Sequence, residues 1–170
     1  QDSSKEAFIS PAKSSDQWGN YKYRKFGTSQ VGFEPGTRIL VAVGSLGVSG
    51  GTSIIFEYAY ALKLAGANVA IGYIRGKSTD SQWHHLSKEF EIQHLSSYRR
   101  GSFDLGIMTW WKTIEPLLEI DCKKFLYFVQ SLESRFAINS HDSEEELAAA
   151  STYLLGIPMI TVAIWLQNVL

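Results

Sequence analysis

The sequence predicts an α/β domain built on a mostly parallel sheet, and three observations support this fold class. From Ile39 onward, short runs of β-branched and aromatic residues alternate with segments of helical periodicity, which is typical of parallel strands joined by helices. Some runs, such as residues 125–129 (FLYFV), are apolar throughout, as are strands buried on both faces. The 170 residues are 45% hydrophobic, which is enough for a full core.

The first strand and helix are well marked at both ends. The apolar residues 38–43 predict a strand, and residues 44–51, which contain four glycines, form the turn that follows. A helix is expected over residues 52–65, where apolar side chains recur at helical spacing. Gly66 suits its end, because glycine readily adopts the conformation that follows a helix.

The later elements continue this alternation. A short helix is expected over residues 113–120, which include Pro116, and an alanine-rich helix over residues 144–155, which begins with three glutamates and precedes Gly156. Together the elements predict a doubly wound, Rossmann-like sheet with helices on both faces, in which ligands bind beyond the carboxyl ends of the strands. The remaining strands are expected over residues 68–74, 91–95, 103–109, 125–129 and 160–162.

Residues 1–37 differ from the rest of the chain. They are polar and irregular, and their aromatic residues lie among Gly, Lys, Arg and Ser without a sustained helical period. We interpret them as an arm laid over the domain surface or as a linker from an upstream domain. The folded domain is expected over residues 38–170, and because the chain begins with Gln1 we read it as an excised segment without a signal peptide.

Composition excludes several classes of partner. A net charge of -1 gives no electrostatic reason to expect nucleic acid or an anionic membrane surface as a partner. No apolar run reaches the roughly 18 residues of a spanning helix, so only peripheral membrane association is left open. Cys122 is the single cysteine, which excludes an internal disulfide and favours a reducing, cytoplasmic compartment.

The glycine-rich turn predicts a binding edge. Four glycines between a strand and a helix leave room for a ligand to approach the backbone, and glycine also tolerates positive φ. The unpaired N–H groups and partial positive charge of the helix N-terminus favour an anionic or hydroxyl-rich ligand there. The alternative is a tight turn needed only for packing the helix on the sheet.

Polar and aromatic residues follow two other predicted strands. Trp110 and Trp111 come after residues 103–109, and residues 130–135 come after 125–129. One of the two tryptophans is expected to face the cleft as a platform for a sugar ring, while Gln130 and Glu133 hydrogen-bond to hydroxyl groups.

Several short blocks, in this order and spacing, resemble the N-terminal domain of GT-B glycosyltransferases. The resemblance extends over residues 38–170 and is to the large retaining nucleotide-sugar group and its rhamnosyltransferase-like branch. The blocks are GVSGG at 47–51, IFEYAYAL at 55–62, AGANV at 65–69, DLGIMTWW at 104–111, YFVQSLE at 127–133, LGIP at 155–158 and ITVAIWL at 160–166.

The resemblance implies the acceptor-side domain of a hexosyltransferase-like enzyme. A saccharide or glycoconjugate acceptor would bind to this domain, and the nucleotide-sugar donor, a co-substrate, would bind mainly to a C-terminal domain absent from the chain. No metal and no other cofactor are implied, and the isolated domain is expected to be inactive. The expected substrate-binding residues are Gly50, Gly51, Trp110, Trp111, Gln130 and Glu133.

The chain departs from the family pattern at three positions. Asn68 and Ala163 replace a usual histidine and a usual capping serine, with structural consequences. Gln130 stands where many relatives carry a histidine beside the donor sugar, and an amide hydrogen-bonds but does not carry a proton near neutral pH. Catalytic residues are therefore left unassigned, with Gln130 a candidate neighbour of the reacting sugar.

Two other functions stay open. One is a non-catalytic carbohydrate-binding or interaction module with the same fold. The other is a nicotinamide-dependent oxidoreductase, although the glycine spacing is not G-x-G-x-x-G and the second strand ends in Arg75 rather than an acid. His84 and His85 are expected to be surface residues and not metal ligands, because no carboxylate or cysteine stands nearby at ligand spacing.

Overall fold

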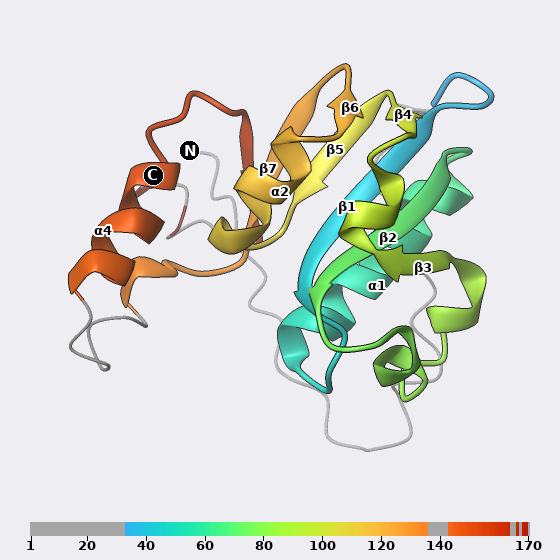
Figure 1. Ribbon diagram of the computed structural model, residues 1–170, viewed down its shortest axis with the longest axis horizontal. Helices are drawn as coiled ribbons and strands as arrows, with labels where there is room; N and C mark the ends of the chain where they lie inside the picture. Colours follow the sequence, from blue (N-terminus) through green and yellow to red (C-terminus); the bar gives the residue numbers. More distant parts are fainter. Residues whose placement is uncertain (1–32, 136–142, 164–165, 167, 170) are drawn as a thin grey trace, which may run out of the picture. The chain divides into compact units, whose positions relative to one another are not determined.

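Figure 1 shows the computed structural model, which describes residues 33–135, 143–163, 166, 168 and 169. The structure described below belongs to the unit Gly32–Leu170. The arm expected over residues 1–37 lies outside the described residues except for residues 33–37.

Six parallel strands form the central sheet in the order β3-β2-β1-β5-β7-β8. If these six strands are numbered by their sequence along the chain, their order across the sheet is 3-2-1-4-5-6. The predicted α/β class with a mostly parallel, Rossmann-like sheet is confirmed. The strands are β1 (Arg38–Ser45), β2 (Asn68–Arg75), β3 (Glu91–His94), β5 (Leu105–Met108), β7 (Phe125–Val129) and β8 (Met159–Thr161).

Apolar clusters lie on both faces of β1. Successive side chains of a strand point to opposite faces, and residues 39–43 of β1 are almost fully buried. The first cluster joins Ile39, Val41 and Val43 to helix α1 (Gly50–Leu64), and the second joins Leu40 and Ala42 to helix α2 (Ile114–Leu118).

Helix α1 begins and ends where its local sequence directs. Ser49 has an extended backbone, and its Oγ accepts a hydrogen bond from the Thr52 N–H at 3.0 Å, as expected of an N-cap serine. The helix starts at Gly50, two residues before the predicted start, and Gly66 follows it at φ +101°. A side chain at such a φ is strained, which explains glycine at this position.

The strand expected over residues 103–109 is interrupted. Its first part, β4 (Ser102–Phe103), pairs with β6 (Asp121–Cys122) in a separate two-stranded sheet, and β5 begins only at Leu105. The interruption falls at Asp104, whose carboxylate accepts the Arg38 N–H at 2.8 Å and pairs with Lys123 at 2.7 Å. These contacts hold Asp104 at the start of β1, so the chain changes strand partners there.

Two predicted helices are shorter than expected. Residues 111–113 form the 3₁₀ turn η5 (Trp111–Thr113), and α2 ends at Leu118, with Pro116 tolerated in its first turn. Helix α4 (Ser143–Thr152) ends before Leu155, because the N–H groups of residues 153–155 bond to carbonyls three residues earlier. Such bonds tighten the chain into turns, which continue to Gly156 at φ +69°.

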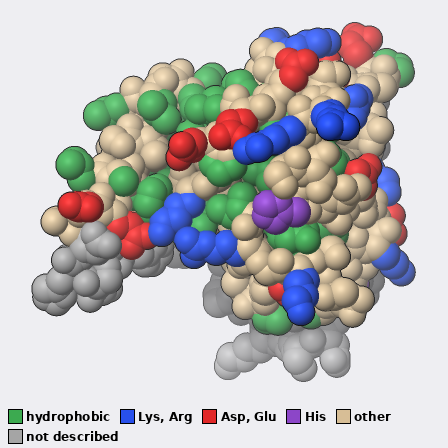
Figure 2. Space-filling model, viewed as in Figure 1, with side chains coloured by type: hydrophobic (Ala, Val, Ile, Leu, Met, Phe, Trp, Pro, Cys, Tyr) green, Lys and Arg blue, Asp and Glu red, His purple; other side chains and the backbone are tan. Residues whose placement is uncertain are grey.

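No helix in the described ranges combines the length and the apolar character needed to cross a membrane. In Figure 2, acidic and basic side chains are interspersed over the visible face, while apolar side chains gather toward α4. Helix α4 and the turn after it expose Leu147, Leu154 and Leu155.

Gly66→Ala is expected to lower the free energy of unfolding by about 1–2 kcal/mol, because alanine is strained at this left-handed φ. Denaturant unfolding followed by circular dichroism measures the change. Gly47→Ala is the matched control, since Gly47 lacks a positive φ and nothing lies within 4 Å of the position of its Cβ. Equal stability of Gly66→Ala and the wild type would contradict the conformational role of this glycine.

Candidate functional site

A cavity of about 500 Å³ lies where β1, β5 and β7 end and helix α1 begins. Four of the residues expected to bind substrate line it, namely Gly51, Trp110, Gln130 and Glu133. They come from three different loops, and the parallel sheet brings these loops to one edge.

The other two expected residues do not line this cavity. No atom lies within 4 Å of the position that a Cβ on Gly50 would occupy. Trp111 borders a second cavity, of about 700 Å³, together with residues of α2 and α4. Of the two tryptophans, Trp110 is therefore the one that faces the cavity at the strand ends, and both are half-buried.

Close contacts, and not unusual backbone angles, explain two of the four glycines in the glycine-rich turn, Gly44 and Gly51. The described glycines with positive φ are Gly36, Gly66, Gly76 and Gly156, none of which belongs to residues 44–51. The turn therefore makes no use of the tolerance of glycine for positive φ. A Cβ on Gly44 would lie 2.6 Å from the Trp110 ring, and one on Gly51 would lie 3.1 Å from Gln130 Oε1. Side chains of the protein itself thus occupy the space that these two glycines leave.

The Trp110 ring is held by cationic neighbours as well as by Gly44. The Arg75 guanidinium and the Lys112 ammonium each lie 5.3 Å from the centre of this ring, a distance at which cation–π attraction operates. Lys112 also lies 4.7 Å from the Trp111 ring and forms an ion pair with Glu145 of α4. Positive charge is thus present beside the aromatic wall of the cavity.

Glu133 is a buried carboxylate that joins two loops. Its Oε2 accepts hydrogen bonds from the Tyr127 hydroxyl and from the Trp111 N–H, both at 2.8 Å. Its own N–H donates to the Tyr153 hydroxyl at 2.9 Å. Burial raises the pKa of Glu133 from 4.5 to about 7, although the two hydrogen bonds act in the opposite direction. The cavity therefore contains a carboxyl group that changes charge near neutral pH.

Gln130 lies between the N-terminus of α1 and the rest of the cavity wall. It directly follows β7, and its amide oxygen faces Gly51. The side chain is half-buried, so its amide can reach both the first turn of α1 and a molecule in the cavity. As an amide, it can orient a hydroxyl group but cannot transfer a proton near neutral pH.

Sequence reasoning left several cavity residues out of the expected set. Arg75, the last residue of β2, lines the cavity, as do Ser49 and Thr52 at the start of α1. Their positions in the sequence could have identified these three residues, because each stands at the carboxyl end of a predicted strand or at the start of the helix that follows. Ser49 and Thr52 are bonded to each other, with the Ser49 hydroxyl donating to Thr52 Oγ1 at 2.8 Å.

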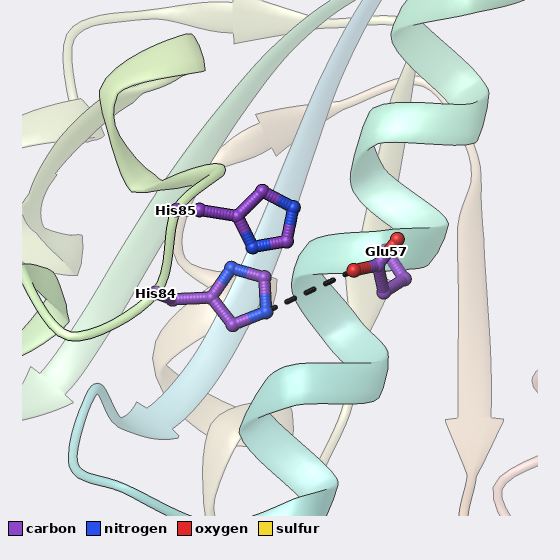
Figure 3. Close-up of side chains that lie close together, drawn as sticks. All are labelled: Glu57, His84 and His85. Carbon is purple, nitrogen blue, oxygen red and sulfur yellow. Dashed lines mark ion pairs between the residues drawn. The ribbon is translucent and has the colours of Figure 1, made fainter. Parts of the chain in front are cut away.

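His84 is not the surface residue that the sequence suggested. Its side chain is buried and stacks on Phe56 of α1 with ring centres 4.7 Å apart. Burial lowers its pKa, the nearby His85 acts in the same direction, and Glu57 opposes them. The fold thus brings Glu57, which is distant in sequence, next to both histidines (Figure 3).

Comparison of the chain with protein-family models, curated proteins and solved structures finds no match. The glycosyltransferase resemblance therefore rests on the sequence blocks alone.

Glu133 is expected to make stability fall as the pH rises from about 4.5 to about 7. The folded-state pKa is higher than the ordinary one, so the folded chain binds more protons in this range and its free energy of unfolding decreases with pH. The full shift corresponds to about 3 kcal/mol. Denaturant unfolding of the wild type and of Glu133→Gln between pH 4 and about 8 measures this contribution, which the glutamine variant should lack. Glu115→Gln is the control on an exposed carboxylate, and identical pH profiles for the wild type and Glu133→Gln would contradict the assignment.

Proposed function

We propose that this chain is the acceptor-side domain of a glycosyltransferase that transfers a sugar from a nucleotide sugar to a saccharide or glycoconjugate. The observation that carries the proposal is the cavity at the strand ends, where an aromatic ring, an amide, a buried carboxyl group and a helix N-terminus meet. Sugars are bound by an apolar ring face together with a few fixed polar contacts, and this set of groups offers both.

The arrangement of the domain supports the proposal. In parallel sheets with this strand order, ligands bind where the direction of the order reverses. In this sheet the reversal lies between β1 and β5. The two apolar clusters, each with its own helix, support the inference that the sheet is doubly wound. We also propose a cytoplasmic location, which is the compartment expected from the single cysteine.

Each group has a role in this proposal. The acceptor ring stacks on Trp110, and its hydroxyls bond to the Gln130 amide and to the Glu133 carboxyl group. Arg75 and the N-terminus of α1 place positive charge at the same cavity, where anionic groups of the donor would approach. The donor would be held mainly by a second domain, so we assign no catalytic acid or base here.

One observation favours a second candidate, a nicotinamide-dependent oxidoreductase. Arg75 ends β2 and lines the cavity beside the N-terminus of α1, where a 2′-phosphate of a dinucleotide would lie in a Rossmann fold. A non-catalytic carbohydrate-binding module would use the same contacts as the leading proposal, and only transfer by the full enzyme separates these two.

Trp110→Ala is expected to weaken binding of an acceptor saccharide about tenfold or more, because stacking on an aromatic ring contributes roughly 1 kcal/mol beyond the buried area. Ligand-observed NMR with a panel of oligosaccharides measures the affinity. Trp111→Ala is the matched control, since Trp111 borders the other cavity. Thermal unfolding of both variants separates loss of binding from loss of packing against Gly44. Equal saccharide affinity of a folded Trp110→Ala variant and the wild type would move the acceptor elsewhere.

A nucleotide panel tests the second candidate. The chain alone is expected to bind NADH, NADPH and nucleotide sugars only weakly, because the leading proposal places the main donor contacts on another domain. Calorimetric titration of each compound, with Arg75→Ala for comparison, measures this. Micromolar NADPH binding that Arg75→Ala abolishes would favour the oxidoreductase, and micromolar nucleotide-sugar binding would place the donor site in this chain.

A further inference from the structure

We propose that Glu57, His84 and His85 together bind one divalent metal ion of the zinc class. Glu57 comes from α1, and the two histidines come from the turn between the 3₁₀ helices η2 (Ser78–Ser81) and η3 (Ser87–Glu89). Figure 3 shows the glutamate carboxylate facing the space beside the two imidazole rings. Two imidazoles and one carboxylate form a ligand set that zinc uses in proteins.

The distances fit a site that closes around an ion. One ligand atom from each residue lies within 4.8 Å of the other two, and His84 Nε2 lies 4.0 Å from Glu57 Oε1. Ligand atoms on a tetrahedral zinc ion lie roughly 3.4 Å apart, given bonds of about 2.0–2.1 Å. His85 is exposed, and the Glu57 side chain is 44% exposed. Both can therefore move by the ångström or so that coordination requires.

His84 is the fixed member of the site. Phe56 stacks on one side of its ring, and Trp83 makes an edge contact. His85 stacks nearly parallel to His84, with ring centres 4.9 Å apart and planes at 23°. A metal ion lies in the plane of each imidazole that binds it, so His85 must turn out of this stack. Its exposure leaves room for that turn.

Metal binding changes two hydrogen bonds of His84. Nδ1 accepts the Leu86 N–H at 3.3 Å, and Nε2 lies 3.2 Å from Ser53 Oγ. Coordination through Nε2 puts the ring proton on Nδ1, so the long bond from Leu86 is lost and Ser53 is displaced from Nε2. The bond between the ion and Nε2 must outweigh the loss of both contacts. Three protein ligands leave a fourth position for water, as in open zinc sites.

The ion would fasten the histidine turn to α1. Trp83, beside the histidines, donates its Nε1–H to the Leu46 carbonyl at 2.8 Å, and Leu46 belongs to the glycine-rich turn. Fixing residues 83–85 on α1 would therefore also restrain the glycine-rich turn, residues 44–51, which borders the cavity. This consequence does not depend on which ligand the cavity binds.

Isothermal titration of the chelator-treated chain with Zn²⁺, and visible absorption with Co²⁺, test the proposal. We expect one ion per chain with micromolar or tighter affinity, together with Co²⁺ absorption bands typical of four-coordinate sites. His85→Ala and Glu57→Gln should each weaken binding at least about tenfold. Both residues are at least partly exposed, so these variants should keep the fold. Unfolding temperatures of the two variants equal to that of the wild type, all measured without metal, would verify this.

His94→Ala is the control for adventitious binding, because His94 is an exposed histidine that bonds to Ser96, outside the three-residue site. Zn²⁺ should also raise the unfolding temperature of the wild type and of His94→Ala, but not that of His85→Ala. Wild-type affinity in both His85→Ala and Glu57→Gln would overturn the proposal. Binding weaker than millimolar, or binding that only His94→Ala abolishes, would overturn it equally.

Discussion

Burial of β1 on both faces is the constraint on which the rest of the structure depends. Ile39, Leu40 and Ala42 are fully shielded from solvent, so this strand needs apolar partners above and below it as well as hydrogen-bonded strands on both edges. Its register places Val41 between Ile71 of β2 and Ile107 of β5. Because all three strands run parallel, their carboxyl ends meet at one edge, and that edge carries the cavity.

Glu133 connects the loops after β5 and β7. Within the described residues, the loops that follow β5 and β7 contain no strand that would align them. Glu133, in the loop after β7, nevertheless accepts the N–H of Trp111 in the loop after β5, and the same oxygen accepts the hydroxyl of Tyr127 in β7. The Glu133 N–H also reaches Tyr153, just beyond α4. A buried carboxyl group of this kind stabilises only while its hydrogen bonds hold, since an unpaired one is strongly unfavourable. The structural and the proposed binding roles of Glu133 therefore depend on the same atoms.

The sequence was sufficient for elements with strong local signals. The apolar run of β1, the Ser49 cap and Gly66 are local features, and the strand and helix that they delimit were predicted to within two residues. The break at Asp104 was missed because it depends on Arg38 and Lys123, which are distant in sequence. The burial of His84 was missed for the same reason, since its partner Phe56 lies on α1. Which of the two adjacent tryptophans lines the cavity at the strand ends likewise depends on tertiary contacts.

The glycine-rich turn shows how a sequence motif can combine packing with binding. A glycine at position 44 is required by Trp110, whose ring would overlap a Cβ there, so part of the motif serves the protein's own core. The same contact, however, holds the Trp110 ring at the cavity, where Arg75 and Lys112 flank it. Packing and binding are therefore not alternatives for this turn. A larger residue at position 44 would displace the aromatic wall itself, so a binding defect there could arise without any direct contact between that residue and a ligand.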